Sequence, residues 1–485
     1  MKRTLIPKIE IENRHPKGMH STTDMEYAKI ATDIATAMSR LKINDITADG
    51  FKLLGLNIAM YFEDVVADAG IWRAFTDRMK EQQGKYLPFF DVDESNYYQD
   101  EPNLDDVRFL VWYTMLEVHH DRITNPESPV IRQLAEAAFT ILAEHFETVS
   151  VNDELKDFFV HPQFTDSFVL QRDVLKWLCF GCYLTYIPHL PQRLFTQAQT
   201  VAQNARCNMD MAYCMAECVL PYNNKIGPLK LLPQQWAADI LRANGNNDAA
   251  NTIESQRFKP YQGYKIVGGE VDKSITLEDV NGETFSISAE NMGHPHEDCY
   301  KQKMAIASFV EYNGVWYLND VCAWSDNLQP FETLHNDYIG KEHMKDALDK
   351  LRKGTALYYF ANQQDMEKFL LQNLPFDENV KKNLKLPEGE NIALYIPEDC
   401  HKDIQILPDA AMCIKDANNP YYNPKMALNQ ALNLAISIEE EVRGYIIAHH
   451  LLPDATINSS QGLKRGNEIV QQNFDFLAKA FVSKH

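Results

Sequence analysis

The sequence predicts an α+β protein with a mainly helical N-terminal domain, a small antiparallel β module and a C-terminal α+β region. Apolar residues recur at helical spacing through the first half of the chain. After Pro260 they alternate with polar residues, as in strands that bury one face. Two Asn-Gly pairs, Asn281-Gly282 and Asn313-Gly314, lie between such alternating runs, and this dipeptide favours tight β-hairpins. These three observations together predict the fold class.

The length of the chain predicts more than one domain. Hydrophobic cores stop growing at roughly 250–300 residues, and the chain has 485. We expect an extended N-terminal arm at 1–21, a helical domain at 22–255, the small antiparallel β module at 258–325 and an α+β C-terminal domain at 326–485. The β module is expected to be either an open sheet or a partly closed barrel.

Several helices of the first domain carry start signals or an apolar face. From Leu54 to Trp72, apolar residues are spaced by three and four positions and share one helix face. Asn103 can cap a helix whose first turn is acidic. Ser128 is an N-cap residue followed by Pro129 at the first helical position. Further helices are expected at 167–186, 195–219 and 233–243.

The C-terminal region mixes strand and helix patterns. We expect short strands at 355–360, 392–396 and 404–407, and helices at 362–373, 426–450 and 466–481. The last of these helices places Val470, Phe474, Leu477 and Phe481 on one face. The region therefore has enough apolar surface to form a core of its own.

The balance of charges argues against broad binding to nucleic acids. The chain has 47 Lys and Arg residues against 68 Asp and Glu residues, a formal net charge of −21. Proteins bind phosphate backbones by displacing counterions with Lys and Arg side chains. A surface this acidic therefore disfavours nucleic acids and anionic membranes, and is compatible with a basic protein partner.

The sequence predicts a cytoplasmic protein. Pro7 and Lys8 interrupt the N-terminus before an apolar stretch of signal-peptide length can form. The most apolar run, 174–187, is shorter than the roughly 20 residues that a membrane crossing needs. Nine cysteines, an odd number without an export signal, are expected to be reduced thiols.

One short segment concentrates potential metal ligands. His294, His296, Glu297 and Cys299 lie within six residues and offer the nitrogen, carboxylate and thiolate ligands that zinc takes. Neighbouring residues rarely all face one ion, and no second cluster at the usual spacing completes the set. A solvated loop between strands is the competing interpretation.

A second candidate is Glu117-x-x-His120. Residues three apart share a helix face, and paired Glu-x-x-His motifs with two further carboxylates form di-iron sites in helix bundles. Glu63 or Asp64 could supply a carboxylate, but the second Glu-x-x-His is missing. The competing interpretation is the polar end of a helix, where histidine interacts favourably with the helix dipole.

Other motifs point to packing. Cys179 and Cys182 lie among apolar neighbours and are expected in the core, since free cysteine behaves as a small hydrophobe. The sequence has no Walker A loop, dinucleotide-binding glycine fingerprint, Gly-x-Ser-x-Gly elbow or His-Glu-x-x-His motif. No cofactor is therefore predicted beyond zinc or another divalent metal at the segments above.

Three stretches resemble an uncharacterised protein family of Bacteroidetes-type bacteria. They are Tyr61–Val66 with Gly70–Phe75, then Asp100–Trp112, and a stretch from Gly462 through Gln471–Leu477. The resemblance covers about a tenth of the chain. It implies a bacterial source, and it assigns no activity and no role to any residue.

Three functions are compatible with the sequence. The leading hypothesis is a non-catalytic binding or regulatory protein that acts through protein–protein contacts. The first alternative is a metal-dependent hydrolase that uses His294, His296 and Glu297 or else Glu117 and His120. The second is nucleic-acid binding through the β module, because small barrels can bind strands in a groove.

Overall fold

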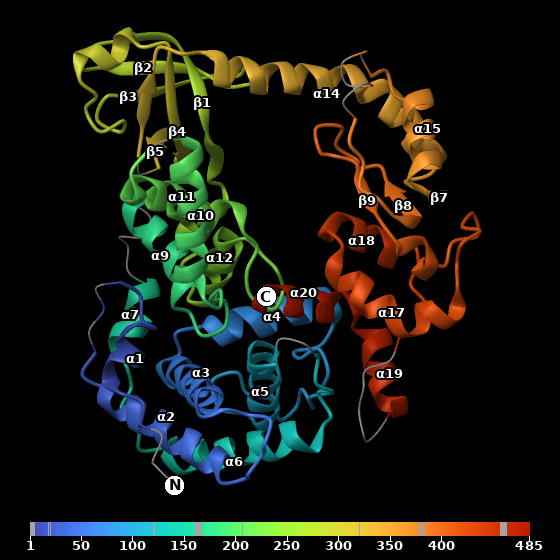
Figure 1. Cartoon of the computed structure of the whole chain (residues 1–485). Helices are drawn as coiled ribbons and strands as arrows, with labels where there is room; N and C mark the ends of the chain where they lie inside the picture. The colour runs from blue at the N-terminus through green and yellow to red at the C-terminus, as the bar shows by residue number, and fades with distance from the viewer. Residues whose placement is uncertain are drawn as a thin grey trace.

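The computed structural model describes most of the chain. The described residues are 5–17, 19, 21–119, 122–160, 167–205, 207–319, 321–376, 378, 381, 384–455 and 463–485. Figure 1 shows a helical N-terminal part, a sheet above it, a long helix that crosses to a second α+β part, and a final helix that returns to the N-terminal helices. The structure therefore confirms the α+β class.

Helices form the first half of the chain, as predicted. They are α1 (Lys8–Glu12), α2 (Asp24–Ser39), α3 (Ala48–Ala67), α4 (Ile71–Gln83), α5 (Leu104–Val118), α6 (Pro129–His145), α7 (Asp153–Val160), α9 (Phe168–Phe180), α10 (Leu190–Ala205), α11 (Met209–Asn223), α12 (Pro233–Ala243) and α13 (Asn247–Glu254). The predicted N-cap is confirmed at α6, where Ser128 Oγ accepts a hydrogen bond from the Val130 amide and Pro129 follows as the first helical residue. Fully buried Trp72, Trp112 and Phe109 lie in the core between these helices.

Several predictions in this half differ from the structure. The helix predicted at 167–186 ends at Phe180, and the one predicted at 195–219 is divided between α10 and α11. The segment predicted as an extended arm contains α1, and Ile6 and Ile11 on it are buried, because they pack into the helical core. The apolar face predicted from 54 to 72 belongs to two helices, not one. The chain turns between them at Asp68 and Gly70, which have positive φ angles of 53° and 85°, a region that favours glycine.

Asp64 determines where α4 begins. Its carboxylate accepts hydrogen bonds from the backbone amides of Ile71 (3.0 Å) and Trp72 (2.7 Å). It also accepts one from the Tyr183 hydroxyl at 2.8 Å. Because the first amides of a helix have no partner within the helix, a buried carboxylate at this point stabilises the start of α4.

A second buried carboxylate, Asp106, lies nearby on α5. It accepts hydrogen bonds from the hydroxyls of Tyr61 and Tyr97, each at 2.8 Å, and Trp72 Nε1 donates to Tyr97 in turn. Burial raises the pKa of Asp106 to about 7, although the hydrogen bonds from the two tyrosines oppose the shift. Burial in a low-dielectric surrounding disfavours the charged form of a carboxyl group.

This shift predicts that stability falls as the pH rises. A carboxyl whose pKa is higher in the folded state than in the unfolded chain stabilises the fold below its unfolded pKa of 3.8, and this contribution is lost as the pH rises through about 7. Between about pH 5 and pH 8 we expect Asp106 to lower the free energy of unfolding by about 2–3 kcal/mol. Urea denaturation at both pH values would measure it. The Asp106→Asn variant should lack this part of the slope, and an equal slope in both proteins would contradict the prediction.

The β module follows the helices and is antiparallel throughout. Its strands are β1 (Arg257–Glu270), β2 (Ser274–Glu278), β3 (Thr284–Ser288), β4 (Met304–Tyr312), β5 (Val315–Leu318) and β6 (Ala323–Ser325). The order is β3-β2-β1-β4-β5, and β6 also pairs with β4. Both predicted hairpins are confirmed. In the β4–β5 hairpin, Asn313 and Gly314 have φ angles of 51° and 75°, as a tight two-residue turn requires.

The sheet of this module is curled. The edge strands β3 and β5 contact each other. Asn291, just after β3, accepts a hydrogen bond from the Leu318 amide and donates one to the Trp316 carbonyl. Tyr264, Phe285 and Phe309 fill the space inside the curve. The module is therefore closer to the predicted partly closed barrel than to an open sheet.

A long helix connects the β module to the last part of the chain. Helix α14 (Gln329–Gly354) has 26 residues, of which only Phe331, Leu348 and Leu351 are buried. Figure 1 shows it crossing between the two parts. Then follow β7 (Leu357–Asn362), α15 (Gln363–Asn373), β8 (Glu390–Tyr395) and β9 (Gln405–Leu407), which form a three-stranded sheet in the order β7-β8-β9 with one helix.

The two long helices predicted at 426–450 and 466–481 are each divided. The structure has α17 (Pro424–Ser437) and α18 (Glu440–Ala448), then α19 (Leu463–Gln472) and α20 (Phe474–Lys484). Ile438 and Glu439 are extended, and Arg443 Nη1 donates to the Ala435 carbonyl, so this side chain satisfies the end of α17. Asn473 interrupts the second pair and donates its side-chain amide to the Ile469 carbonyl.

Helix α20 packs into the N-terminal helices. Phe476 is 2% exposed, and its ring lies 5.5 Å from that of Phe89 and 6.0 Å from that of Phe109. Tyr113 and Ser483, 370 positions apart, share a hydrogen bond of 2.7 Å. The core of the helical region is thus completed by a segment that lies outside the predicted helical domain. The predicted domain boundaries themselves stay predictions.

Candidate functional site

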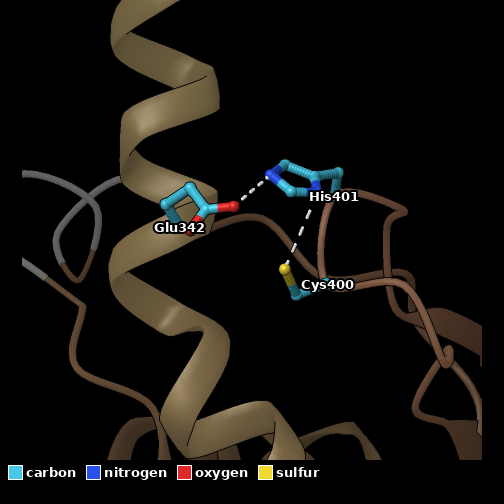
Figure 2. Close-up of side chains that lie close together, drawn as sticks. All are labelled: Glu342, Cys400 and His401. Carbon is cyan, nitrogen blue, oxygen red and sulfur yellow. Dashed lines mark hydrogen bonds and ion pairs between the residues drawn. The ribbon is translucent and has the colours of Figure 1, made fainter. Parts of the chain in front are cut away.

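The candidate site lies where α14 passes the connection between β8 and β9. Glu342 projects from the middle of α14, and Cys400 and His401 are neighbours in that connection. Figure 2 shows the three side chains turned toward one another. One potential ligand atom from each lies within 4.8 Å of the other two. Residues 397–403 are called the 397–403 loop below.

His401 is held from both sides of its ring. Its Nε2 atom lies 2.7 Å from Glu342 Oε1, and its Nδ1 atom lies 3.0 Å from Asp399 Oδ1 and 3.7 Å from Cys400 Sγ. Among the described residues, Nε2 is buried without a hydrogen-bond partner, and it faces the Glu342 carboxylate. The ring of Tyr338 stacks on the imidazole at 4.5 Å. These contacts fix the plane of the ring and point Nε2 toward Glu342.

The backbone of the loop is also held in place. Asp399 Oδ1 accepts a hydrogen bond from the His401 amide, and this bond is the main reason that the pKa of Asp399 is lowered. Lys341, next to Glu342 on α14, donates to the His401 carbonyl at 3.0 Å and forms an ion pair with Asp403 at 2.9 Å. The loop is therefore bound to α14 by more than the cluster itself.

The Cys400 side chain is buried, and its thiol is less acidic than that of an ordinary cysteine. It is 7% exposed and belongs to the apolar core between α14, α15 and β8. Burial raises the pKa of its thiol, with the charge of Glu342 as a second cause. A cysteine nucleophile needs a lowered pKa, because the thiolate is the reactive form. The arrangement therefore disfavours a nucleophilic thiol, whereas a bound cation would favour the thiolate.

A polar cleft of about 900 Å³ adjoins the 397–403 loop. The loop contributes Glu398, Asp399 and Lys402 to its wall. Opposite lie Glu441 of α18, which forms an ion pair with Lys402 at 2.7 Å, and Lys225 of the helical region. The other lining residues are Arg352, Tyr395, Glu439, Glu440, Gly444, Tyr445, Ala448 and His449. The cleft can thus offer cations, carboxylates and aromatic rings to a polar ligand.

The segment predicted to bind metal is an exposed turn. His296 precedes a short 3₁₀ helix, η1 (Glu297–Lys301), and its side chain is 79% exposed. His296 pairs with Asp298 at 3.4 Å, and Glu297 with Lys301 at 3.3 Å. Among the described residues, the groups of three potential ligands that lie close together do not include His294, His296, Glu297 or Cys299. Metal binding there stays a prediction.

Of the second predicted pair, Glu117 and His120, the structure describes only Glu117. His120 lies outside the described residues. Glu117 accepts a short hydrogen bond from the Tyr186 hydroxyl and lies 3.6 Å from Lys484 Nζ. Burial lowers the pKa of Lys484 to about 8, which the charge of Glu117 opposes. Glu117 therefore belongs to a buried contact between α5 and α20.

Sequence patterns could not point to the observed cluster. Glu342 lies on a helix of weak apolar periodicity, far along the chain from Cys400 and His401. The only local signal is the run Glu398-Asp399-Cys400-His401, which is too short to form a known ligand spacing. Only the fold brings the three residues together.

These features define an α+β protein with a curled antiparallel sheet and a Glu-Cys-His cluster beside a polar cleft. The chain belongs to the family described as a protein of unknown function, DUF3843, which it matches over residues 5–276 and 315–483. The matched ranges include the Glu342–Cys400–His401 cluster and leave out the exposed turn with His294 and His296.

Other comparisons add no relative. No curated protein matches the chain, and no solved structure matches it. The family membership agrees with the resemblance to an uncharacterised family. Among the described residues, helices with both the length and the apolar character for a membrane crossing are absent.

Proposed function

We propose that the protein binds a divalent metal ion of the zinc class through Glu342, Cys400 and His401, beside the polar cleft. The observation that carries the proposal is the state of His401. Its Nδ1 side is held by Asp399, while Nε2 is buried without a hydrogen bond and faces the Glu342 carboxylate. A carboxylate that holds the far nitrogen of a ligating histidine is a common feature of metal sites.

The three side chains suit zinc chemically. Zinc binds thiolate, imidazole and carboxylate, and softer thiolate ligands select it over magnesium or calcium. The ion would displace the thiol proton of Cys400, which burial otherwise retains. Three protein ligands leave a fourth tetrahedral position for water, as in catalytic rather than structural zinc sites.

Removing a ligand is expected to weaken metal binding at least tenfold. Cys400→Ser and His401→Gln each remove a direct ligand, and Asp399→Asn removes the partner of Nδ1, for which a loss of about 10–100-fold is typical. The protein should be purified without a polyhistidine tag and titrated with Zn²⁺ or Co²⁺. With Co²⁺, a thiolate-to-metal absorption band should appear, and it should be missing in Cys400→Ser.

Cys413→Ser is the matched control. Cys413 is also buried in the C-terminal region, 3% exposed, and is not part of the cluster. It should bind metal as the wild type does. The proposal would be refuted if Cys400→Ser and His401→Gln each bound as many metal ions as the wild type, or if the wild-type protein took up neither ion.

The other hypotheses about function stay predictions. Two exposed apolar side chains in the first half of α14, Leu334 and Ile339 at 42% and 38% exposure, support a role in protein–protein contacts. A hydrolase that uses His294, His296 and Glu297, nucleic-acid binding by the β module, and the cytoplasmic location are untested. The ion proposed here would be compatible with either a hydrolase or a binding protein.

A further inference from the structure

A second cluster of potential ligands lies in the N-terminal helices, far from the first in the fold. His15 follows α1, Asp24 is the first residue of α2, and Glu63 lies near the end of α3. All three side chains are 0% exposed. One potential ligand atom from each lies within 4.8 Å of the other two. Three ionisable groups this deeply buried require an explanation, because buried charges are normally paired or bind metals.

Glu63 is the hydrogen-bond partner of one ring nitrogen of His15. Glu63 Oε2 lies 2.8 Å from His15 Nε2, and Glu63 Oε1 accepts a hydrogen bond of 2.8 Å from the Asn152 side chain. Asn152 thereby holds the carboxylate in the position that pairs with Nε2. When Nε2 of the neutral imidazole carries the proton and donates it to Glu63, the free lone pair of the ring is on Nδ1. This is the tautomer that a metal bound at Nδ1 would require.

The opposite nitrogen has no such partner. His15 Nδ1 and both carboxylate oxygens of Asp24 are buried and have no hydrogen bond among the described residues. Nδ1 and Asp24 Oδ1 are 3.5 Å apart. Two ligands of one ion, each about 2.0–2.2 Å from it, are separated by a little more than 3 Å. The two groups are therefore spaced as ligands rather than as a hydrogen-bonded pair.

The surrounding charges are mostly negative. The charged groups that act on His15 and Asp24 are Glu63, Glu12 and Lys8. Lys8 forms ion pairs with two of the carboxylates, since its Nζ lies 2.8 Å from Glu12 and 3.6 Å from Asp24. When the imidazole is neutral and the carboxyl groups of Asp24, Glu63 and Glu12 are all ionised, these three carboxylates and the Lys8 ammonium group carry a net charge of −2. A divalent cation would neutralise this charge.

A cavity adjoins the cluster at His15. It has a volume of about 530 Å³ and is lined by His15, Glu12 and Asn13 on one side and by Trp177 and Lys176 of α9 on the other. Its size leaves room for water molecules as further ligands.

We propose that His15 Nδ1 and the Asp24 carboxylate bind a divalent first-row transition-metal ion, with Glu63 as the residue that positions the His15 ring. Imidazole with carboxylates suits manganese, ferrous iron and zinc. This site has no thiolate, unlike the cluster at Cys400, so the two sites differ in the ions that they favour. The proposal does not depend on the proposed function of the first site.

Manganese binding tests the proposal. Mn²⁺ is the probe because carboxylates suit it and thiolates do not. The full chain carrying Cys400→Ser is titrated with Mn²⁺, and the electron paramagnetic resonance signal of the free ion is measured. We expect one bound ion and a saturable increase in melting temperature. Adding Asp24→Asn should weaken Mn²⁺ binding at least tenfold and abolish the increase.

Glu26→Gln is the matched control. Glu26 lies on the same turn of α2 and accepts a hydrogen bond from the Ser150 amide outside the cluster, so its loss should leave Mn²⁺ binding unchanged. The metal-free proteins give a second readout. A site built for a cation predicts that Asp24→Asn is at least as stable as the parent without metal, whereas a purely structural ion pair predicts a clear loss. Unchanged Mn²⁺ binding in Asp24→Asn, or none in the parent, would overturn the proposal.

Discussion

Replacing Phe476 with alanine is expected to lower the free energy of unfolding by about 3–5 kcal/mol, the usual cost of removing a buried phenylalanine ring. The ring is 2% exposed and packs against the rings of Phe89, Phe109 and Trp112. Urea denaturation followed by tryptophan fluorescence would measure the loss.

Phe481→Ala on the same helix is the matched control. Its ring is only partly buried and stacks on His485 at 4.1 Å. We expect it to cost less than half as much as Phe476→Ala, because much less apolar surface is lost from the core. Equal effects of the two substitutions would show that α20 contributes through its helical structure and not through insertion of Phe476.

The second large effect is expected at Asp64. Asp64→Ala would leave two backbone amides and the Tyr183 hydroxyl without their acceptor. Each buried unsatisfied group costs about 1–3 kcal/mol. Burial raises the pKa of Asp64 to about 6, so the variant also removes a carboxylate that is costly to ionise. We therefore expect a net loss of about 3–5 kcal/mol.

Asp68→Ala provides the comparison. Asp68 lies four residues further on, is 41% exposed, and pairs with Arg73 and Lys156. Exposed ion pairs contribute less than about 1 kcal/mol. Asp64→Asn should recover part of the lost stability because its side-chain oxygen can still accept. Chemical denaturation would measure the free energy of unfolding of the three variants. Equal values for Asp64→Ala and Asp68→Ala would contradict the role given to Asp64.

Local signals predicted much of the fold. The two Asn-Gly pairs predicted the β2–β3 and β4–β5 hairpins, because the left-handed backbone of a tight turn restricts which residues can occupy it. Ser128-Pro129 likewise predicted the start of α6. Such signals act over a few residues, so they can be recognised without knowledge of the rest of the structure.

Non-local contacts explain what the sequence did not reveal. Helix α14 escaped prediction because only three of its 26 residues are buried, too few to form an apolar stripe. The division at Asn473 could not be recognised, since Val470, Phe474 and Leu477 keep helical spacing across it. Likewise, Glu342 meets Cys400 and His401 only through the packing of α14 on the β8–β9 connection.

The return of α20 to the first helices has a consequence for biosynthesis. Tyr113 leaves the ribosome long before Ser483, with which it shares a hydrogen bond across 370 positions. Domains commonly fold as they emerge, N-terminal first, but here the early helices expose the surface meant for Phe476 until translation has passed that codon. During this interval the apolar surface that Phe476 covers in the finished fold has no partner.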